Sequence, residues 1–358
     1  MLLPANAAQQ IKDGSTCSKK GAITRVSSTQ YVCTLKNKKL IWVKSPAKVI
    51  NNKEQSKLEN ESSKSPSPIP TPQPYAKVDS ISRDIYLKLD AMSLDLYSKL
   101  NSKDSDITIE FENPNDSFST GVMETTKLGF KLLRIIYPSL PSQNVYFYEN
   151  VNWVESRVMP ICPRTMEWVR QYGQANAGCG VLFVADLPIF HKFGFEVAKN
   201  IATHEMFHNV TIKAEAEVPE NQRKFGQVAS WFTEGMAQIT SGWTRALYKD
   251  SKNPHYGELE WQDNWKQKDC QNALNLWKSG NINANHEQTM NCEYGLGRLM
   301  SEILIAKSGS YAPVLDMHRD RYQGVPFEQS LEKRFGISNA EFFKLVDQRL
   351  KALGWSNF

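Results

Sequence analysis

The spacing of apolar residues changes along the chain and predicts the order of its elements. Helical spacing over 79–100 predicts one helix, and the same spacing over 119–136, ending before Pro138, predicts a second. Short apolar runs bounded by turn residues predict strands over 107–111, 145–148 and 180–184. Helical patterning then continues from about 193 to the end of the sequence, with breaks near 212–225, 250–262 and 308–325. A few strands followed mostly by helices predict an α+β domain over 79–358.

The first 78 residues differ in character from the rest. Residues 1–8 resemble the end of a signal peptide, with Ala5-Asn6-Ala7 as a small-x-small cleavage site. Residues 9–44 contain two strand-like runs and predict a small folded module. Residues 45–78 are rich in Ser, Asn, Lys and Pro and contain few large apolar residues, so they predict an extended linker without a core.

The charge balance changes at the same place. Residues 1–78 carry 13 Lys and Arg against 4 Asp and Glu, whereas the remainder of the chain carries 30 against 34. A basic head on a mildly acidic body indicates an attachment segment joined to a separate globular unit. The alternative is an ordinary solvated basic surface.

Six cysteines follow one another as three local pairs, Cys17/Cys33, Cys162/Cys179 and Cys270/Cys292. An even count in short loops favours disulfides and therefore an oxidising compartment. Six cysteines allow fifteen connectivities, so sequential pairing is the favoured arrangement and not a unique one. Because no apolar run reaches the ~18–20 residues that span a bilayer, we expect a secreted or cell-surface protein with no transmembrane segment in its mature form.

The segment His204-Glu205-Met206-Phe207-His208 carries the strongest chemical signal. Residues four apart on a helix lie about 40° apart around its axis, so both imidazoles face one way and can bind one cation. Glu205, next to the first ligand, then lies beside the open position of the metal, where it can take a proton from water. The pattern predicts a zinc site, with chance occurrence as the alternative.

A second segment, Trp231-Phe232-Thr233-Glu234-Gly235-Met236-Ala237-Gln238, begins 23 residues after His208. A catalytic zinc needs three protein ligands and one open position, and Glu234 on a second helix would complete the set. Its apolar neighbours make an unpartnered carboxylate costly. Taken alone, Glu234 is more typical of a partly exposed helix carboxylate than of a metal ligand. The first motif, at a suitable distance in the sequence, reverses this preference.

Together these two segments resemble the gluzincin metallopeptidases, the group that holds thermolysin-like enzymes and the aminopeptidase N family. The resemblance implies a zincin-like fold, one Zn²⁺ per chain and hydrolysis of peptide bonds. It implies His204, His208 and Glu234 as zinc ligands and Glu205 as general base. It covers 200–358 well and 79–199 only in the order of strands and helices.

A third segment, Cys292-Glu293-Tyr294-Gly295-Leu296-Gly297, extends the resemblance. In the aminopeptidase group a Tyr three residues before a Gly stabilises the oxyanion, and Tyr294 and Gly297 fit that spacing. A phenol suits this role because it donates a hydrogen bond to developing negative charge. Two alternatives stay open: Tyr294 is an ordinary core residue, or His286 takes the role, as a His does in thermolysin-like relatives.

The sequence departs from the aminopeptidases at one point, because it has no Gly-x-Met-Glu-Asn segment to hold a free amine. This slightly favours an endopeptidase. In zincins an extended peptide pairs with the edge of the sheet above the active helix, and 180–184 is the expected edge strand. Gly180, Val181 and Leu182 are therefore the predicted substrate-binding residues, and the Cys162–Cys179 loop is expected to border the cleft.

The small module, residues 9–44, is predicted to bind a partner other than the peptide substrate. Its paired cysteines and closing Lys39-Leu40-Ile41-Trp42 resemble short basic repeats at the ends of exported actinobacterial proteins. The resemblance implies binding to an anionic cell-wall polymer, and export favours such a polymer over nucleic acid. Two alternatives to a general peptidase remain: a non-enzymatic surface protein on a gluzincin-like scaffold, and a processing factor that acts on one partner protein.

Overall fold

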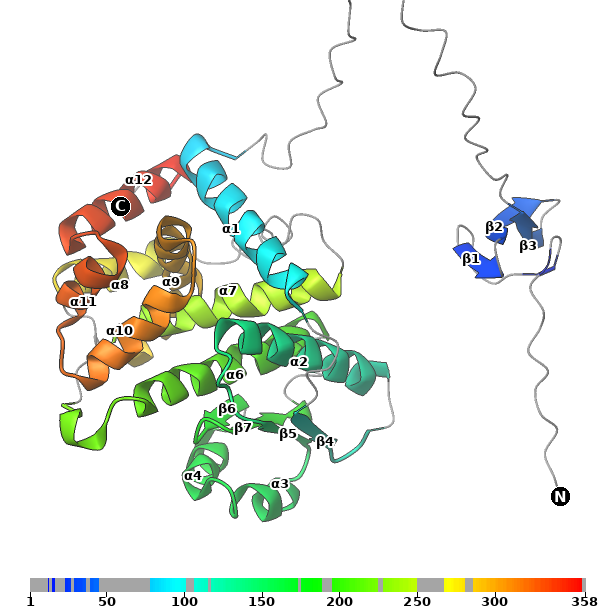
Figure 1. Cartoon of the computed structure of the whole chain (residues 1–358), viewed down its shortest axis with the longest axis horizontal. Coiled ribbons are helices and arrows are strands. Elements are labelled where there is room, and N and C mark those ends of the chain that lie inside the picture. The colour runs from blue at the N-terminus through cyan, green and yellow to red at the C-terminus, as the bar shows by residue number, and fades with distance from the viewer. Residues whose placement is uncertain are drawn as a thin grey trace, which may run out of the picture. The chain divides into compact units, whose positions relative to one another are not determined.

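The structure, a computed structural model, describes residues 12, 15–16, 23–26, 29–36, 39–44, 78–100, 106–114, 117–172, 175–188, 195–224, 228–249, 267–280 and 286–355 (Figure 1). The chain divides into two units, Met1–Pro70 and Thr71–Phe358. The boundary falls within the predicted linker 45–78. That linker apart from Val78, the predicted signal-peptide remnant 1–8 and the predicted break 250–262 lie outside the described residues.

The N-terminal unit holds a three-stranded antiparallel sheet in the order β1-β2-β3. Its strands are β1 (Ile23–Val26), β2 (Thr29–Lys36) and β3 (Lys39–Lys44). Cys33 of β2 is buried and disulfide-bonded. Its predicted partner Cys17 lies outside the described residues. The two strand-like runs predicted in this module are confirmed.

The second unit combines a four-stranded sheet with helices, which confirms the α+β prediction. The first half contains α1 (Ser80–Ser98), β4 (Ile107–Phe111), α2 (Ser117–Ile136), β5 (Gln143–Tyr148), α3 (Val151–Val158), α4 (Pro163–Tyr172), β6 (Ala175–Gly178) and β7 (Leu182–Asp186). The second half contains α6 (Phe195–Ala216), a 3-10 turn (Glu220–Gln222), α7 (Ser230–Tyr248), α8 (Gln267–Lys278), α9 (His286–Ser308), α10 (Ala312–Tyr322), α11 (Phe327–Phe335) and α12 (Asn339–Ala352).

The sheet has the order β4-β5-β7-β6, with β4, β5 and β7 parallel and β6 antiparallel at one edge. Helices α2 and α6 lie on one side of it and α3 and α4 on the other (Figure 1). Alternate residues of each strand therefore enter different cores. Phe147 and Phe183 pack into the large core that α2 and α6 share, whereas Tyr148 and Val184 pack against α3 and α4. Burial on both faces is typical of largely parallel sheets and explains the short apolar runs in the sequence.

Helix α7 packs against α9, α6 and α2, and its most extensive contact is with α9. Two glycines allow this approach. A Cβ added to Gly297 would lie 2.6 Å from the carbonyl oxygen of Trp231, and one added to Gly235 would overlap the carbonyl of Gly297. Any larger residue at either position would push the two helices apart. Trp231 itself is fully buried and stacks on Phe342 of α12.

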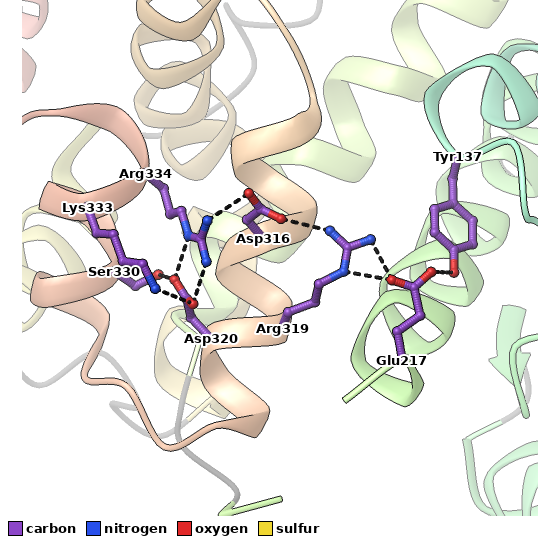
Figure 2. A network of polar contacts seen from close by, with 8 residues as sticks. All are labelled: Tyr137, Glu217, Asp316, Arg319, Asp320, Ser330, Lys333 and Arg334. Atoms are coloured by element: carbon purple, nitrogen blue, oxygen red, sulfur yellow. Dashed lines mark hydrogen bonds and ion pairs between the residues drawn. The ribbon is translucent and has the colours of Figure 1, made fainter. Parts of the chain in front are cut away.

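Helix α10 occupies the segment 308–325 that the apolar pattern predicted as a break, so that prediction is wrong. The sequence Asp316-Met317-His318-Arg319-Asp320-Arg321-Tyr322 is strongly polar, which hides its helical periodicity. Its charges are instead neutralised by neighbours in a continuous network between α10, α11 and the ends of α2 and α6 (Figure 2). The network consists of Tyr137, Glu217, Asp316, Arg319, Asp320, Ser330, Lys333 and Arg334.

This network fixes the chain where it leaves α6. Arg319 of α10 donates to Glu217 at 2.8 Å and to Asp316 at 2.8 Å, and Tyr137 donates to the same Glu217 (Figure 2). Two residues before Glu217, Glu215 accepts from Arg321 at 3.1 Å. Because charge-assisted hydrogen bonds are stronger than neutral ones, these bonds from α10 stabilise the position of the C-terminal end of α6.

Two predicted disulfides are confirmed. Cys162–Cys179 joins the beginning of α4 to the turn after β6, and Cys270–Cys292 joins α8 to α9. Within the described ranges, no helix combines the length and the apolar character needed to cross a membrane.

Candidate metal centre

Helix α6 brings two imidazoles together near the middle of the second unit. The run from 195 to 216 contains neither Pro nor Gly, and Ala202, Met206 and Val210 bury one face of the helix at four-residue spacing. His204 and His208 lie one turn apart on another face, with their Nε2 atoms 3.2 Å apart. Both rings are largely shielded from solvent, and His204 is 3% exposed.

The third group comes from α7. Glu234 Oε2 lies 3.0 Å from His204 Nε2, and Glu234 Oε1 lies 3.6 Å from His208 Nε2. The glycine at 235 contributes to this geometry, because it lets α7 sit deep against α9 beside the residue that carries the carboxylate. The structure thus brings together all three residues that the sequence predicts as metal ligands.

The three ligand atoms fit a single zinc ion. They lie within 4.8 Å of one another. With ligand bonds of 2.0–2.1 Å, two ligands of a tetrahedral zinc are about 3.4 Å apart. His204 Nε2 lies 3.2 Å from His208 Nε2 and 3.0 Å from Glu234 Oε2, and the other carboxylate oxygen, Oε1, lies 3.6 Å from His208 Nε2. Two imidazole nitrogens and one carboxylate form a donor set that zinc accepts, and three protein ligands leave a fourth position open.

Without a bound metal, Glu234 and His208 form an ion pair. Burial alone would raise the pKa of Glu234, but His208 and His204 outweigh it, so the pKa lies below its usual range. Burial would lower the pKa of His208, yet the neighbouring Glu234 carboxylate raises it to about 9. The carboxylate is therefore ionised and His208 is protonated at neutral pH.

Glu205 directly follows His204 on α6, the helix that packs against the edge strand β6. Its carboxylate accepts a hydrogen bond from the backbone N–H of Ala177 in β6. Burial raises the pKa of Glu205, and the attraction of His208 and His204 reduces that rise. A carboxyl group with a raised pKa beside an open metal position has the properties of a general base.

Tyr294 of α9 completes the surroundings of the group. Its ring centroid lies 5.7 Å from that of His204. Burial raises the pKa of Tyr294, and the carboxylates of Glu234, Glu205 and Glu293 raise it further. The phenol therefore stays protonated and can donate a hydrogen bond. The alternative, His286, begins α9, but its side chain lies outside the described residues.

The predicted edge strand is wrong in its position. Residues 182–186 form β7, which pairs with β5 on one side and with β6 on the other, so β6 is the edge. Gly180 and Val181 belong to the turn before β7, and Leu182 is fully buried. The sequence Ala175-Asn176-Ala177-Gly178 has small residues and no apolar alternation, which is why the pattern does not reveal this strand. The substrate-binding role predicted for Gly180, Val181 and Leu182 stays a prediction.

Asn209 was missed by the sequence-based reasoning although it directly follows His208. Its Nδ2 donates to Gln143 Oε1 at 2.9 Å and to the carbonyl of Leu182 at 2.8 Å. Gln143 in turn donates to the carbonyl of Gly180 at 3.1 Å. The side-chain amides of Asn209 and Gln143 thus connect α6 to the sheet. Local sequence does not reveal this hydrogen bond, because the two residues are 66 positions apart.

No protein-family model, curated protein or solved structure matches the chain.

Proposed function

We propose that the protein is a zinc-dependent peptide hydrolase with a zincin-like catalytic unit of the gluzincin type. One observation carries the proposal: His204, His208 and Glu234, which come from two helices, each place one possible ligand atom within 4.8 Å of the other two, close enough to bind one zinc ion. The presence of Glu205 and Tyr294 next to this group supports hydrolysis rather than a purely structural metal.

In the proposed reaction Glu205 transfers the proton and Tyr294 stabilises negative charge. When bound, zinc supplies a Lewis acid that polarises the scissile carbonyl and lowers the pKa of water towards about 7. Glu205 accepts the proton of the attacking water and later passes it to the leaving amine. Tyr294 donates a hydrogen bond to the oxyanion. The hydrogen bond between Glu205 and β6 supports the edge strand as the place where an extended peptide lies.

The proposed location is outside the cytoplasm, as a secreted or cell-surface protein. Two disulfides in the catalytic unit fit an oxidising compartment. The excess of Lys and Arg over residues 1–78 fits attachment to an anionic cell-wall polymer.

Metal analysis tests the proposed site. Protein purified without added zinc should contain about one zinc per chain, because three charged or polar ligands form a complete set. Glu234→Ala should lose most of this metal, since two ligands remain. Glu205→Gln should keep it, because Glu205 lies beside the site and is not a ligand. Sub-stoichiometric zinc that Glu234→Ala leaves unchanged would contradict the assignment.

A further inference from the structure

A third carboxylate, besides Glu205 and Glu234, lies next to the candidate metal centre and has no role in the proposed reaction. Glu293 of α9 is fully buried. Its Oε1 accepts a hydrogen bond from the hydroxyl of Ser230 at 2.7 Å and another from the hydroxyl of Thr289 at 2.6 Å. Thr289 belongs to the same helix as Glu293, one turn earlier, whereas Ser230 belongs to α7. The carboxylate therefore joins two helices at a defined point.

The position of this contact along each helix is significant. Ser230 is the first residue of α7, and Glu234 follows it by four residues, which is one helical turn. On α9, Glu293 directly precedes Tyr294. The hydrogen bond between Ser230 and Glu293 thus fixes the turn of α7 that carries a metal ligand to the turn of α9 that carries the candidate oxyanion donor.

The first turn of α7 has no capping side chain of its own. Its N-cap residue is Ala229, which supplies no side-chain hydrogen bond. A negative charge at the N-terminus of a helix is stabilised by the helix dipole, so Glu293 suits this location. A buried carboxylate is otherwise costly, and the two hydroxyl donors reduce that cost.

We propose that Glu293 is a positioning residue, which holds the first turn of α7 through Ser230 so that Glu234 reaches the two histidines at ligand distance. This inference rests on the proposed function, because it assigns Glu293 to the zinc site. Groups that orient metal ligands from outside the ligand set change metal affinity by about 10- to 100-fold when they are removed. Glu293 would act in this way through the backbone of α7.

The test compares two serine variants that remove the same kind of bond. Ser230→Ala deletes the hydroxyl that donates to Glu293. Ser330→Ala is the matched control, because Ser330 donates at 2.8 Å to Asp320, another fully buried carboxylate, in the α10–α11 network (Figure 2). The zinc dissociation constant of each full-length protein is measured by competition with a chromophoric chelator, and the unfolding midpoint is measured in parallel.

We expect Ser230→Ala to weaken zinc binding by about 10-fold or more and Ser330→Ala to leave it within about twofold, although both lower the unfolding midpoint. Ser230→Thr, which keeps the hydroxyl, should restore the affinity. Glu293→Gln should weaken zinc binding at least as much as Ser230→Ala. If Glu293→Gln does not fold, the serine variants alone decide the outcome.

Two failures can be told apart. Wild-type protein that binds no zinc would overturn the proposed function and this inference with it. Wild-type protein that binds zinc no more tightly than folded Ser230→Ala would overturn only the role of Glu293.

Discussion

Within the candidate centre, Glu234 and His208 determine each other's charge. Each is largely but not fully shielded from solvent, and this partial burial by itself disfavours the charged form of both groups. Their proximity reverses this, because Glu234 raises the pKa of His208 to about 9 while the pKa of Glu234 falls. Without a metal, the His208 imidazole therefore carries a proton at neutral pH. A metal ion must displace this proton before His208 can act as a ligand.

This competition predicts proton release on zinc binding. A zinc ligand must be an unprotonated imidazole, so binding at pH 7 should release about one proton from His208. The apparent zinc affinity should weaken by about tenfold for each pH unit below about 9. Calorimetry in buffers of different ionisation enthalpy measures the number of protons released. In Glu234→Gln, where the charge that raises the pKa is absent, the release at pH 7 should shrink, and a wild-type release near zero would contradict the ion pair.

Single residues also show how far sequence alone could lead. His204, His208 and Glu234 were predictable because four-residue spacing on one helix and an apolar setting on the next both carry chemical meaning. Glu293 and Asn209 were not, because their roles depend on Ser230 and Gln143, which are 63 and 66 residues away in the chain. No local pattern encodes such pairs.

Among the helices and strands, the contact between α7 and α9 has the greatest effect on the site. It depends on Gly235 and Gly297, whose missing side chains leave room for the backbone of the opposite helix. Helix α7 packs against α6 as well, but the glycine at 235 faces α9.

Gly235→Ala should therefore be destabilising, although Ala forms helices better than Gly by about 1 kcal/mol. The added methyl would overlap the carbonyl of Gly297, and overpacking of this kind typically costs about 1–3 kcal/mol. Because Glu234 is adjacent, zinc binding should weaken as well. Denaturant unfolding of the zinc-loaded and zinc-free protein measures both effects.

Gly297→Ala is the matched variant, because it fills the same interface from the other helix, where its Cβ would lie 2.6 Å from the carbonyl oxygen of Trp231. The double variant should cost less than the sum of the two, since once the helices separate the second methyl finds space. A Gly235→Ala protein as stable as the wild type would show that the helices do not pack this closely.

The elements themselves were predictable to different extents. Strands β4 and β5 and helices α1 and α2 follow from apolar spacing, because each buries a defined face. Strand β6 and helix α10 do not. The first has only small and polar residues, and the second is stabilised by the charged network of Figure 2 rather than by a broad apolar stripe. The wrong position of the edge strand follows directly from missing β6.

The molecule as a whole assembles its candidate centre from distant parts of the chain. The sheet and α2 support α6 on one side, α9 holds α7, and the charged network fixes the end of α6. The sequence indicated the α+β class, two of the disulfides and the ligand set, since these depend on local spacing. The tertiary contacts that bring the ligand helices together could not be read from it.

Digestion of a broad peptide library, followed by mass spectrometry, tests the central claim most directly. Zinc-loaded wild-type protein should cleave peptide bonds, lose this activity with a zinc chelator and regain it when zinc is restored. Glu205→Gln should retain zinc yet lower cleavage by at least about 100-fold, because the general base is missing. Cleavage that survives chelation, cleavage by Glu205→Gln at the wild-type rate, or no cleavage by zinc-loaded wild-type protein would contradict the account.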